Sequence, residues 1–317
     1  MIKKDYFWPL LGLAAVAFSV YVLIEQLRDI SYEDVIRSLE AISMHGWLMA
    51  GLATVFAYIA LAGYDSLALA HLRKKVPWSF ISVASFTAYA IGHNLGASVF
   101  SGAVVRYRAY SSQGLTPSEI GILVAFCSFT FALGSILLGG LALVIEPSLP
   151  AHFHKSLPHW LAFFIGTVML GLVLLYIWGS LTNRSCFHLW KLRIEYPNFS
   201  LVCRQLLVAP LELLAAAAII YYALPEQSNP GYFMVLGIFL ASFSAALLSH
   251  APGGLGVLEV MFLLALPDVE PADVIAALLV FRLFYLLIPF AISLIFVVWF
   301  EQDQLLKKFK KCPPKAD

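Results

Sequence analysis

The stretch Ala84-Ser-Phe-Thr-Ala-Tyr-Ala-Ile-Gly-His-Asn-Leu-Gly96 recurs later in the chain as Ala241-Ser-Phe-Ser-Ala-Ala-Leu-Leu-Ser-His-Ala-Pro-Gly253. Six of the thirteen positions are identical, including the histidine and the closing glycine. Each copy runs through more glycine into a short segment that carries a charge, Arg106 in the first copy and Glu259 in the second. A repeated pair of hydrophobic segments interrupted by glycine is the best sequence indication of a transporter's binding site. The repeat therefore predicts a transporter-like membrane fold.

The composition is that of a membrane protein. Of the 317 residues, 61% are hydrophobic and 12% are charged, and the mean hydropathy is +0.85, whereas a soluble domain carries about 25% charged residues. The net charge of +1 gives no indication of a nucleic-acid partner. The four cysteines lack Cys-x-x-Cys spacing, and no nucleotide-binding, zinc-protease or nucleophile-elbow motif is present. We therefore expect no cofactor, no metal site and no catalysis.

Six apolar segments have the length of about 20 residues that a spanning helix needs. They lie near 6–26, 46–70, 117–145, 157–180, 200–222 and 271–299. The first exceeds the core of a typical signal peptide, about 7–15 residues, and is expected to be an uncleaved span. Two further segments, 80–112 and 229–266, are interrupted by glycine and proline. Each could cross the membrane, or enter and return as a re-entrant hairpin.

The distribution of positive charge favours the re-entrant arrangement. With the N-terminus inside and two re-entrant hairpins, 16 of the 20 basic residues lie on the cytoplasmic side, as the positive-inside rule requires. If segment 80–98 crossed fully instead, this bias would largely disappear. The sequence thus predicts an all-α multi-pass protein with about six spanning helices, two re-entrant hairpins and both termini in the cytoplasm.

The two hairpins are expected to form an inverted repeat, because three spans separate them and one therefore enters from each side. The repeat units cover about 80–145 and 229–299. They belong to a single integral membrane domain, 1–317, whose basic tail, 301–317, is expected to bind anionic lipid.

Two short motifs extend the repeat beyond the hairpins. Thr116-Pro-Ser-Glu-Ile120 opens one long span and Glu270-Pro-Ala-Asp-Val274 opens its counterpart. Proline followed two residues later by an acid is typical of a helix start. Upstream, segment 32–42 is expected to be a short amphipathic helix in the outer interface, or else a solvated loop.

Charged residues within the spans are the candidates for function, because each costs about 2.5–3.5 kcal/mol on insertion scales. Asp65 and Arg106 are both expected in the inner half of the bilayer, where they could pair. A functional Arg106 would hold a lipid phosphate with two hydrogen bonds. Alternatively, Arg106 and Arg108 extend to the cytoplasmic interface and serve no site.

Arg282 is expected near the midplane, about 16 Å deep at 1.5 Å per residue. It needs an anionic partner or a polar cavity there, and Glu259 and Glu212 are the available acids. The pair could be purely structural, or Arg282 could line a polar groove. Glu212 follows Pro210, and a proline kink beside an acid indicates a cavity wall.

The hairpin turns supply the remaining candidate site residues. His93 and His250 either hydrogen-bond the broken helix ends or carry protons, since a neutral imidazole titrates near pH 7. Irregular backbone is tolerated at membrane depth only where it lines a cavity or is buried. The turn residues concerned are Asn94, Gly96, Gly102, Pro252, Gly253, Gly254 and Gly256. Three further histidines, 152, 154 and 159, are expected in a solvated outer loop rather than at a metal.

With these residues in view, the chain resembles YbhN-type members of the lysylphosphatidylglycerol synthase/flippase (multiple peptide resistance factor) family over essentially its whole length. The resemblance rests on Gly63-Tyr-Asp65, Gly102 through Arg106-Tyr-Arg108 to Tyr110, Pro252-Gly-Gly-Leu-Gly-Val-Leu-Glu259, and Ala276-Ala-Leu-Leu-Val-Phe-Arg282 running into Pro289. The family's charged intramembrane positions fall on Asp65, Arg106, Glu259 and Arg282, with Glu212 a looser match.

The resemblance implies a lipid translocase of the bacterial inner membrane, in which a headgroup crosses through a polar groove between the hairpins. Because the chain ends at Asp317 with no synthase domain, it implies transport without synthesis. The lipid partner is left open among phosphatidylglycerol, cardiolipin and a polyprenyl phosphate. Two alternatives remain: a module that presents lipid to a partner lipid-synthesis enzyme, and a scaffold whose charges only hold helices together.

Overall fold

The computed structural model describes residues 31–95, 98–153, 158–182, 186–189, 192–249 and 252–311, and these residues are almost entirely helical. Six of the described helical segments are long and apolar enough to cross a membrane. They are Met44–His71, Pro117–Ile145, His159–Leu181, Phe199–Ala223, Tyr232–Ser249 and Pro271–Phe300. The chain is therefore a multi-pass helical membrane protein.

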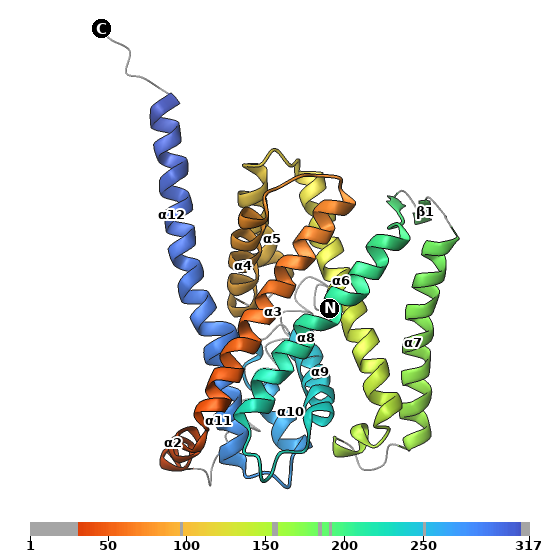
Figure 1. The fold of residues 1–317 in the computed structure, drawn as a ribbon, viewed down its shortest axis with the longest axis vertical. Helices are drawn as coiled ribbons and strands as arrows, with labels where there is room; N and C mark the ends of the chain where they lie inside the picture. The colour runs from red at the N-terminus through yellow and green to blue at the C-terminus, as the bar shows by residue number, and fades with distance from the viewer. Residues whose placement is uncertain are drawn as a thin grey trace, which may run out of the picture.

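The elements follow one another along the chain as shown in Figure 1. The α-helices are α2 (Tyr32–Ala41), α3 (Met44–His71), α4 (Trp78–Leu95), α5 (Ser98–Ser111), α6 (Pro117–Ile145), α7 (His159–Leu181), α8 (Phe199–Ala223), α9 (Tyr232–Ser249), α10 (Val257–Ala265), α11 (Pro271–Phe281) and α12 (Ile288–Lys311). Short 3-10 turns occupy η1 (Leu149–His152) and η2 (Pro252–Gly254), and η3 (Arg282–Leu287) is a π-helix.

Five of the six expected spans coincide with α3, α6, α7, α8 and the continuous α11–η3–α12 helix. The expected first span, 6–26, lies outside the described residues. The sixth candidate span in the structure is α9, which the sequence assigns to an interrupted segment. The expected helix at 32–42 is present as α2, which begins with a Ser31–Asp34 capping box.

The all-α fold class is confirmed, with one short non-helical element. A short antiparallel hairpin joins α7 to α8, in which β1 (Cys186–Leu189) pairs with β2 (Leu192–Glu195). Alternation of apolar and charged residues over only four positions, as in Leu192-Arg-Ile-Glu195, is too short a signal to separate from a polar loop.

Glycines bring α3, α6 and α8 into close contact at the centre of the molecule. A Cβ atom at Gly134 of α6 would lie 2.6 Å from the carbonyl oxygen of Ala209 on α8. A Cβ atom at Gly63 of α3 would lie 2.8 Å from Val208, which is also in α8. Small residues at helix interfaces are how membrane helices gain dispersion contacts without a hydrophobic driving force between them. The three helices thus form the scaffold that the remaining elements cover.

Two helix pairs flank this scaffold in opposite halves of the view in Figure 1, α4 with α5 and α9 with α10. Lys74, just before α4, pairs with Glu119 at the start of α6 at 2.8 Å. The entry to α4 and the exit from α5 therefore lie at the same end of the molecule. With 14 residues, α5 is about 21 Å long, and the 9-residue α10 is about 14 Å long. Both are shorter than the hydrocarbon core of about 30 Å.

The last helix is interrupted by its proline. Pro289 has no N–H to donate to the Tyr285 carbonyl four residues earlier. The Tyr58 hydroxyl of α3 donates to that carbonyl instead, at 2.9 Å. The neighbouring Leu286 carbonyl accepts from the Asn94 amide of α4 at 3.0 Å. The π-helix η3 is therefore fixed to α3 through the carbonyl that the proline leaves free, and to α4 through the neighbouring carbonyl.

Candidate functional site

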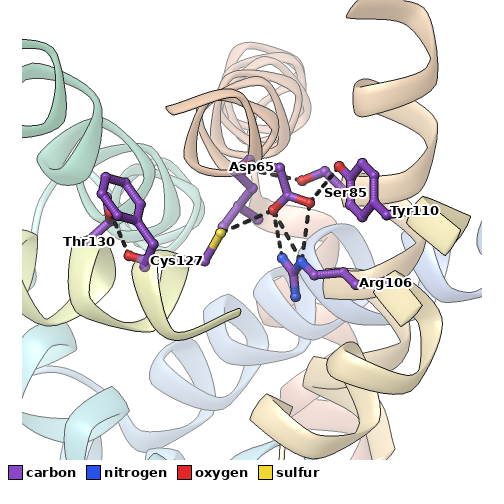
Figure 2. A network of polar contacts seen from close by, with 8 residues as sticks. Asp65, Ser85, Arg106, Tyr110, Cys127 and Thr130 are labelled. Carbon is purple, nitrogen blue, oxygen red and sulfur yellow. Dashed lines mark hydrogen bonds and ion pairs between the residues drawn. The ribbon is translucent and has the colours of Figure 1, made fainter. Parts of the chain in front are cut away.

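The first buried ion pair joins α3 to α5. Arg106 Nη2 lies 2.8 Å from Asp65 Oδ1, and its Nε lies 3.1 Å from Oδ2 (Figure 2). Asp65 is 0% exposed and Arg106 is 4% exposed. The expected pair is present, and the alternative in which Arg106 extends to the interface is wrong, because the short α5 turns this side chain toward the scaffold. Arg108, two residues on, is exposed.

Three further side chains surround this pair. The Tyr110 hydroxyl donates to Asp65 Oδ2 at 2.8 Å, and Cys127 Sγ of α6 lies 3.3 Å from Oδ1. The Tyr89 ring of α4 lies beneath the guanidinium, with its centroid 4.4 Å from Cζ. A cation over an aromatic face gains more when it is desolvated. The pair and its three partners therefore come from four helices, α3 to α6.

The second ion pair joins α10 to the last long helix. Arg282 Nε donates to Glu259 Oε1 at 2.7 Å, and Arg282 Nη1 donates to the Gly253 carbonyl at 2.9 Å. Glu259 also accepts from the Gly256 amide at 2.9 Å. Gly253 has φ of +59° and Gly256 of +80°, conformations that glycine adopts without a Cβ penalty. The glycine turn thus aims backbone groups at both members of the pair.

Glu212 of α8 is placed differently from the other intramembrane acids. It is 1% exposed, and its Oε1 accepts a short hydrogen bond from the Tyr285 hydroxyl. Its Oε2 has no hydrogen-bond partner, and no cation pairs with it among the described residues. Of the two acids expected to be available to Arg282, Glu259 is the partner and Glu212 is not.

His93 and Asn94 end α4 beside the π-helix. The His93 ring stacks on Tyr285 at 5.3 Å between centroids and 17° between planes, and it also contacts Tyr89 at 5.7 Å. Its Nδ1 is buried without a partner. Asn94 reaches the Leu286 carbonyl.

The structure describes some of the other residues expected at the hairpin turns and not others. Gly102 lies where α5 approaches α4, since a Cβ there would be 3.2 Å from the Ala88 carbonyl oxygen. Gly254, with φ of +64°, belongs to the glycine turn, and Pro252 begins η2. Gly96 and His250 lie outside the described residues, as does the loop histidine His154. The role of the second repeated histidine therefore stays a prediction.

The sequence interpretation missed the tyrosines that connect these groups. Tyr110 follows Arg106 by four residues, Tyr89 precedes His93 by four, and Tyr285 follows Arg282 by three. Residues three or four apart share one helix face. A tyrosine three or four residues from Arg106, from His93 and from Arg282 was the available signal.

These features define a class of protein: a multi-pass helical membrane protein in which, among the described residues, two arginine–carboxylate pairs within the membrane each link a short helix pair to a long helix. The chain belongs to the family described as the lysylphosphatidylglycerol synthase TM region, whose model matches residues 10–293.

Relatives support the same assignment. The chain is 31% identical to the protein slr0712 of Synechocystis sp. over 285 residues, covering 88% of this chain and 87% of the relative. It is 30% identical to the inner membrane protein YbhN of Escherichia coli over 291 residues, covering 90% and 89%. It is 27% identical to the phosphatidylglycerol lysyltransferase of Staphylococcus haemolyticus over 300 residues, covering 93% of this chain but 34% of that enzyme.

Proposed function

We propose that this protein is a lipid translocase of the bacterial inner membrane, which moves an anionic lipid headgroup between leaflets. The observation that carries the proposal is that each helix pair takes part in one arginine–carboxylate ion pair, Arg106 of α5 with Asp65 and Glu259 of α10 with Arg282 of η3. Arg106 donates to both Asp65 oxygens through Nε and Nη2, whereas Arg282 donates to Glu259 through Nε and contacts it as an ion pair through Nη2. A guanidinium can donate two parallel hydrogen bonds to a phosphate, as Arg106 does to Asp65.

In the proposed mechanism, a lipid phosphate replaces each carboxylate in turn. Asp65 and Arg106 are both buried in the described conformation, so this conformation is closed, and transport needs an opening between a helix pair and the scaffold. An isolated arginine would be costly within the membrane. Asp65 and Glu259 therefore keep the arginines neutralised while no headgroup is bound.

The proposal includes the two helix pairs as re-entrant hairpins of an inverted repeat. The Lys74–Glu119 pair and the lengths of α5 and α10 support this arrangement. Two opposed hairpins would line the two ends of one groove, with lipid tails remaining outside it. The chain has no nucleotide-binding motif, so movement would be downhill or coupled to an ion gradient.

A second function is favoured by one comparison. The phosphatidylglycerol lysyltransferase relative matches over 34% of its length, so in that enzyme the membrane region accompanies further chain. A membrane module that presents lipid to a separate lipid-synthesis enzyme would use the same arginines without moving the headgroup across. The two functions differ in whether the purified protein alone changes leaflet distribution.

The test is headgroup translocation in proteoliposomes that contain reporter phosphatidylglycerol, cardiolipin or a polyprenyl phosphate. Wild type is compared with Arg106→Lys and Arg282→Lys, which keep the charge but lose the two-point geometry, and with the double variant Asp65→Arg/Arg106→Asp. We expect one lipid class to move with wild type and all three variants to lose most of that movement.

Two results would count against the proposal. A charge-swapped double variant that folds and transports at the wild-type rate would assign the pair a structural role only. If well-folded wild type moved no lipid, the presenting module would be favoured instead, and association with a lipid-synthesis enzyme would be measured next.

A further inference from the structure

Among the residues that the structure describes, Glu212 is the intramembrane acid that the two ion pairs leave over. Asp65 is neutralised by Arg106 and Glu259 by Arg282, whereas no described lysine, arginine or histidine pairs with Glu212. The cost of a buried charge without a counter-ion is several kcal/mol. A proton on the carboxyl group removes that charge.

The hydrogen bonds around Glu212 suit the neutral carboxylic acid. The Tyr64 hydroxyl of α3 lies within hydrogen-bonding reach of the Glu212 side chain, and its one hydrogen is donated to the Ala209 carbonyl at 2.7 Å. It therefore has only lone pairs left to offer to Glu212. A carboxylate oxygen would meet these lone pairs unfavourably, whereas a protonated oxygen could donate to such an acceptor. The Glu212 Oε2 atom without a donor is the atom on which such a proton would reside.

The other titratable groups around Glu212 are neutral hydroxyls. Tyr58 and Tyr64 reach it from α3 and Tyr285 from η3. His93 of α4 stacks on the Tyr285 ring. The described titratable groups of α6, α7, α9 and α11 do not act on Glu212. Its charge state is thus set within one small group of aromatic residues.

A continuous series of contacts connects this group to both ion pairs. Tyr285 bonds Glu212 through its hydroxyl and stacks on His93, whose ring contacts Tyr89 beneath Arg106. Tyr285 also lies in the π-helix that begins with Arg282. Short π-helical segments occur frequently at functional sites. A change in the charge of Glu212 would therefore act first on Tyr285, which shares a helix with Arg282 and is connected to Arg106 through His93 and Tyr89.

We propose that Glu212 is a buried proton-binding site, and that release of its proton leaves a charge without a counter-ion, which favours entry of water beside Tyr285 and so couples a proton gradient to the opening of the arginine sites. The coupling rests on the proposed lipid translocation, whereas proton binding at Glu212 does not. The reaction is the exchange of one proton between Glu212 Oε2 and the water that enters when the site opens.

The first experiment measures the proton directly. Infrared difference spectra of the full-length protein in lipid nanodiscs are recorded across a pH titration, in the carbonyl-stretch region of protonated carboxyl groups. We expect a titrating band in wild type and in the control Glu270→Gln, an exposed acid at the start of α11, and its loss in Glu212→Gln. A band that persists in Glu212→Gln, or that is missing from wild type, would overturn the proposal.

The second experiment measures coupling in proteoliposomes with and without an imposed pH gradient. Wild type and Glu270→Gln should move lipid several-fold faster with the gradient, whereas any movement by Glu212→Gln should proceed at one rate in both conditions. Equal wild-type rates in both conditions would refute the coupling. A wild type that moves no lipid but shows the Glu212 band would refute the translocase and still support the proton-binding site.

Discussion

At the scale of single residues, the charges within the membrane fall into two kinds. Arg106 and Arg282 have carboxylate partners and additional acceptors or aromatic neighbours, whereas Glu212 has only hydroxyl groups around it. A buried pair is weak evidence of stability by itself, since a well-packed apolar pair often does as well. Removing one member is different, because it leaves the other charged and desolvated.

The Asp65–Arg106 pair provides the first prediction. Asp65→Ala should lower the free energy of unfolding by about 3–5 kcal/mol, because Arg106 is then left as an uncompensated buried charge. The double variant Asp65→Leu/Arg106→Met should recover most of this loss while abolishing lipid movement. Unfolding in bilayers or nanodiscs measures the first effect and the proteoliposome assay the second. Equal losses of unfolding free energy in the single and double variants would mean that the packing of side chains, and not an unpaired charge, determines how strongly α5 is held to α3.

The sequence predicted these residues better than it predicted their partners. Asp65, Arg106, Glu259 and Arg282 stand out because charge is rare within apolar segments. Which acid meets Arg282 could not be settled, since Glu212 and Glu259 were both available and the choice depends on how α8 and α10 pack. The tyrosines were missed because an aromatic residue is unremarkable in a membrane helix unless its position on the helix face is considered.

At the scale of elements, prolines and glycines determine where helices bend and how closely they approach. Span positions followed from hydropathy, and the starts of α6 and α11 from Thr116-Pro117 and Glu270-Pro271. The π-helix did not follow, because Pro289 predicts only that a carbonyl is freed. Whether that carbonyl is satisfied by water, by a wider helix or by another helix is decided by tertiary contacts.

The bond that replaces the missing proline amide can be tested with a double-mutant cycle. Tyr58→Phe leaves the Tyr285 carbonyl without its donor and should destabilise the protein by about 1–3 kcal/mol. In a Pro289→Ala background the restored amide can donate to the same carbonyl, so Tyr58→Phe should cost less there. Unfolding free energies of the four variants give the coupling directly. Additive effects would show that Tyr58 does not substitute for the proline amide.

The contact between α6 and α8 gives a second prediction at this scale. Gly134→Ala should destabilise by about 1–3 kcal/mol, because its Cβ would meet the Ala209 backbone at 2.6 Å. Gly121→Ala, on the same helix with nothing within 4 Å, should be neutral or slightly stabilising, since alanine favours the helix over glycine. Thermal unfolding of both variants provides the comparison. A stable Gly134→Ala protein would mean that α6 and α8 can separate at little cost.

At the scale of the whole molecule, the arrangement joins two chemically similar helix pairs through one scaffold. Each pair contributes one member of an ion pair, Arg106 from α5 and Glu259 from α10. The opposite member comes in each case from a long helix. In the first ion pair the arginine is on the short helix and the acid on the long helix, and in the second the positions are reversed. The two sites are therefore not equivalent, and a headgroup phosphate would meet a different set of neighbours at each.

The re-entrant topology itself is the final prediction, and it can be measured without knowing the lipid. The exposed residues Lys75 and Gln113 flank α4–α5, and Gln227 and Asp268 flank α9–α10. Each is replaced singly by cysteine in a protein whose four native cysteines have been removed, and labelled in intact and lysed cells with a membrane-impermeant maleimide. Positions 75 and 113 should react only after lysis, and 227 and 268 in intact cells, because a hairpin returns both its ends to one side. If 75 and 113 reacted on opposite sides, α4–α5 would cross the membrane, the excess of cytoplasmic basic residues would vanish, and the groove between opposed hairpins could not exist.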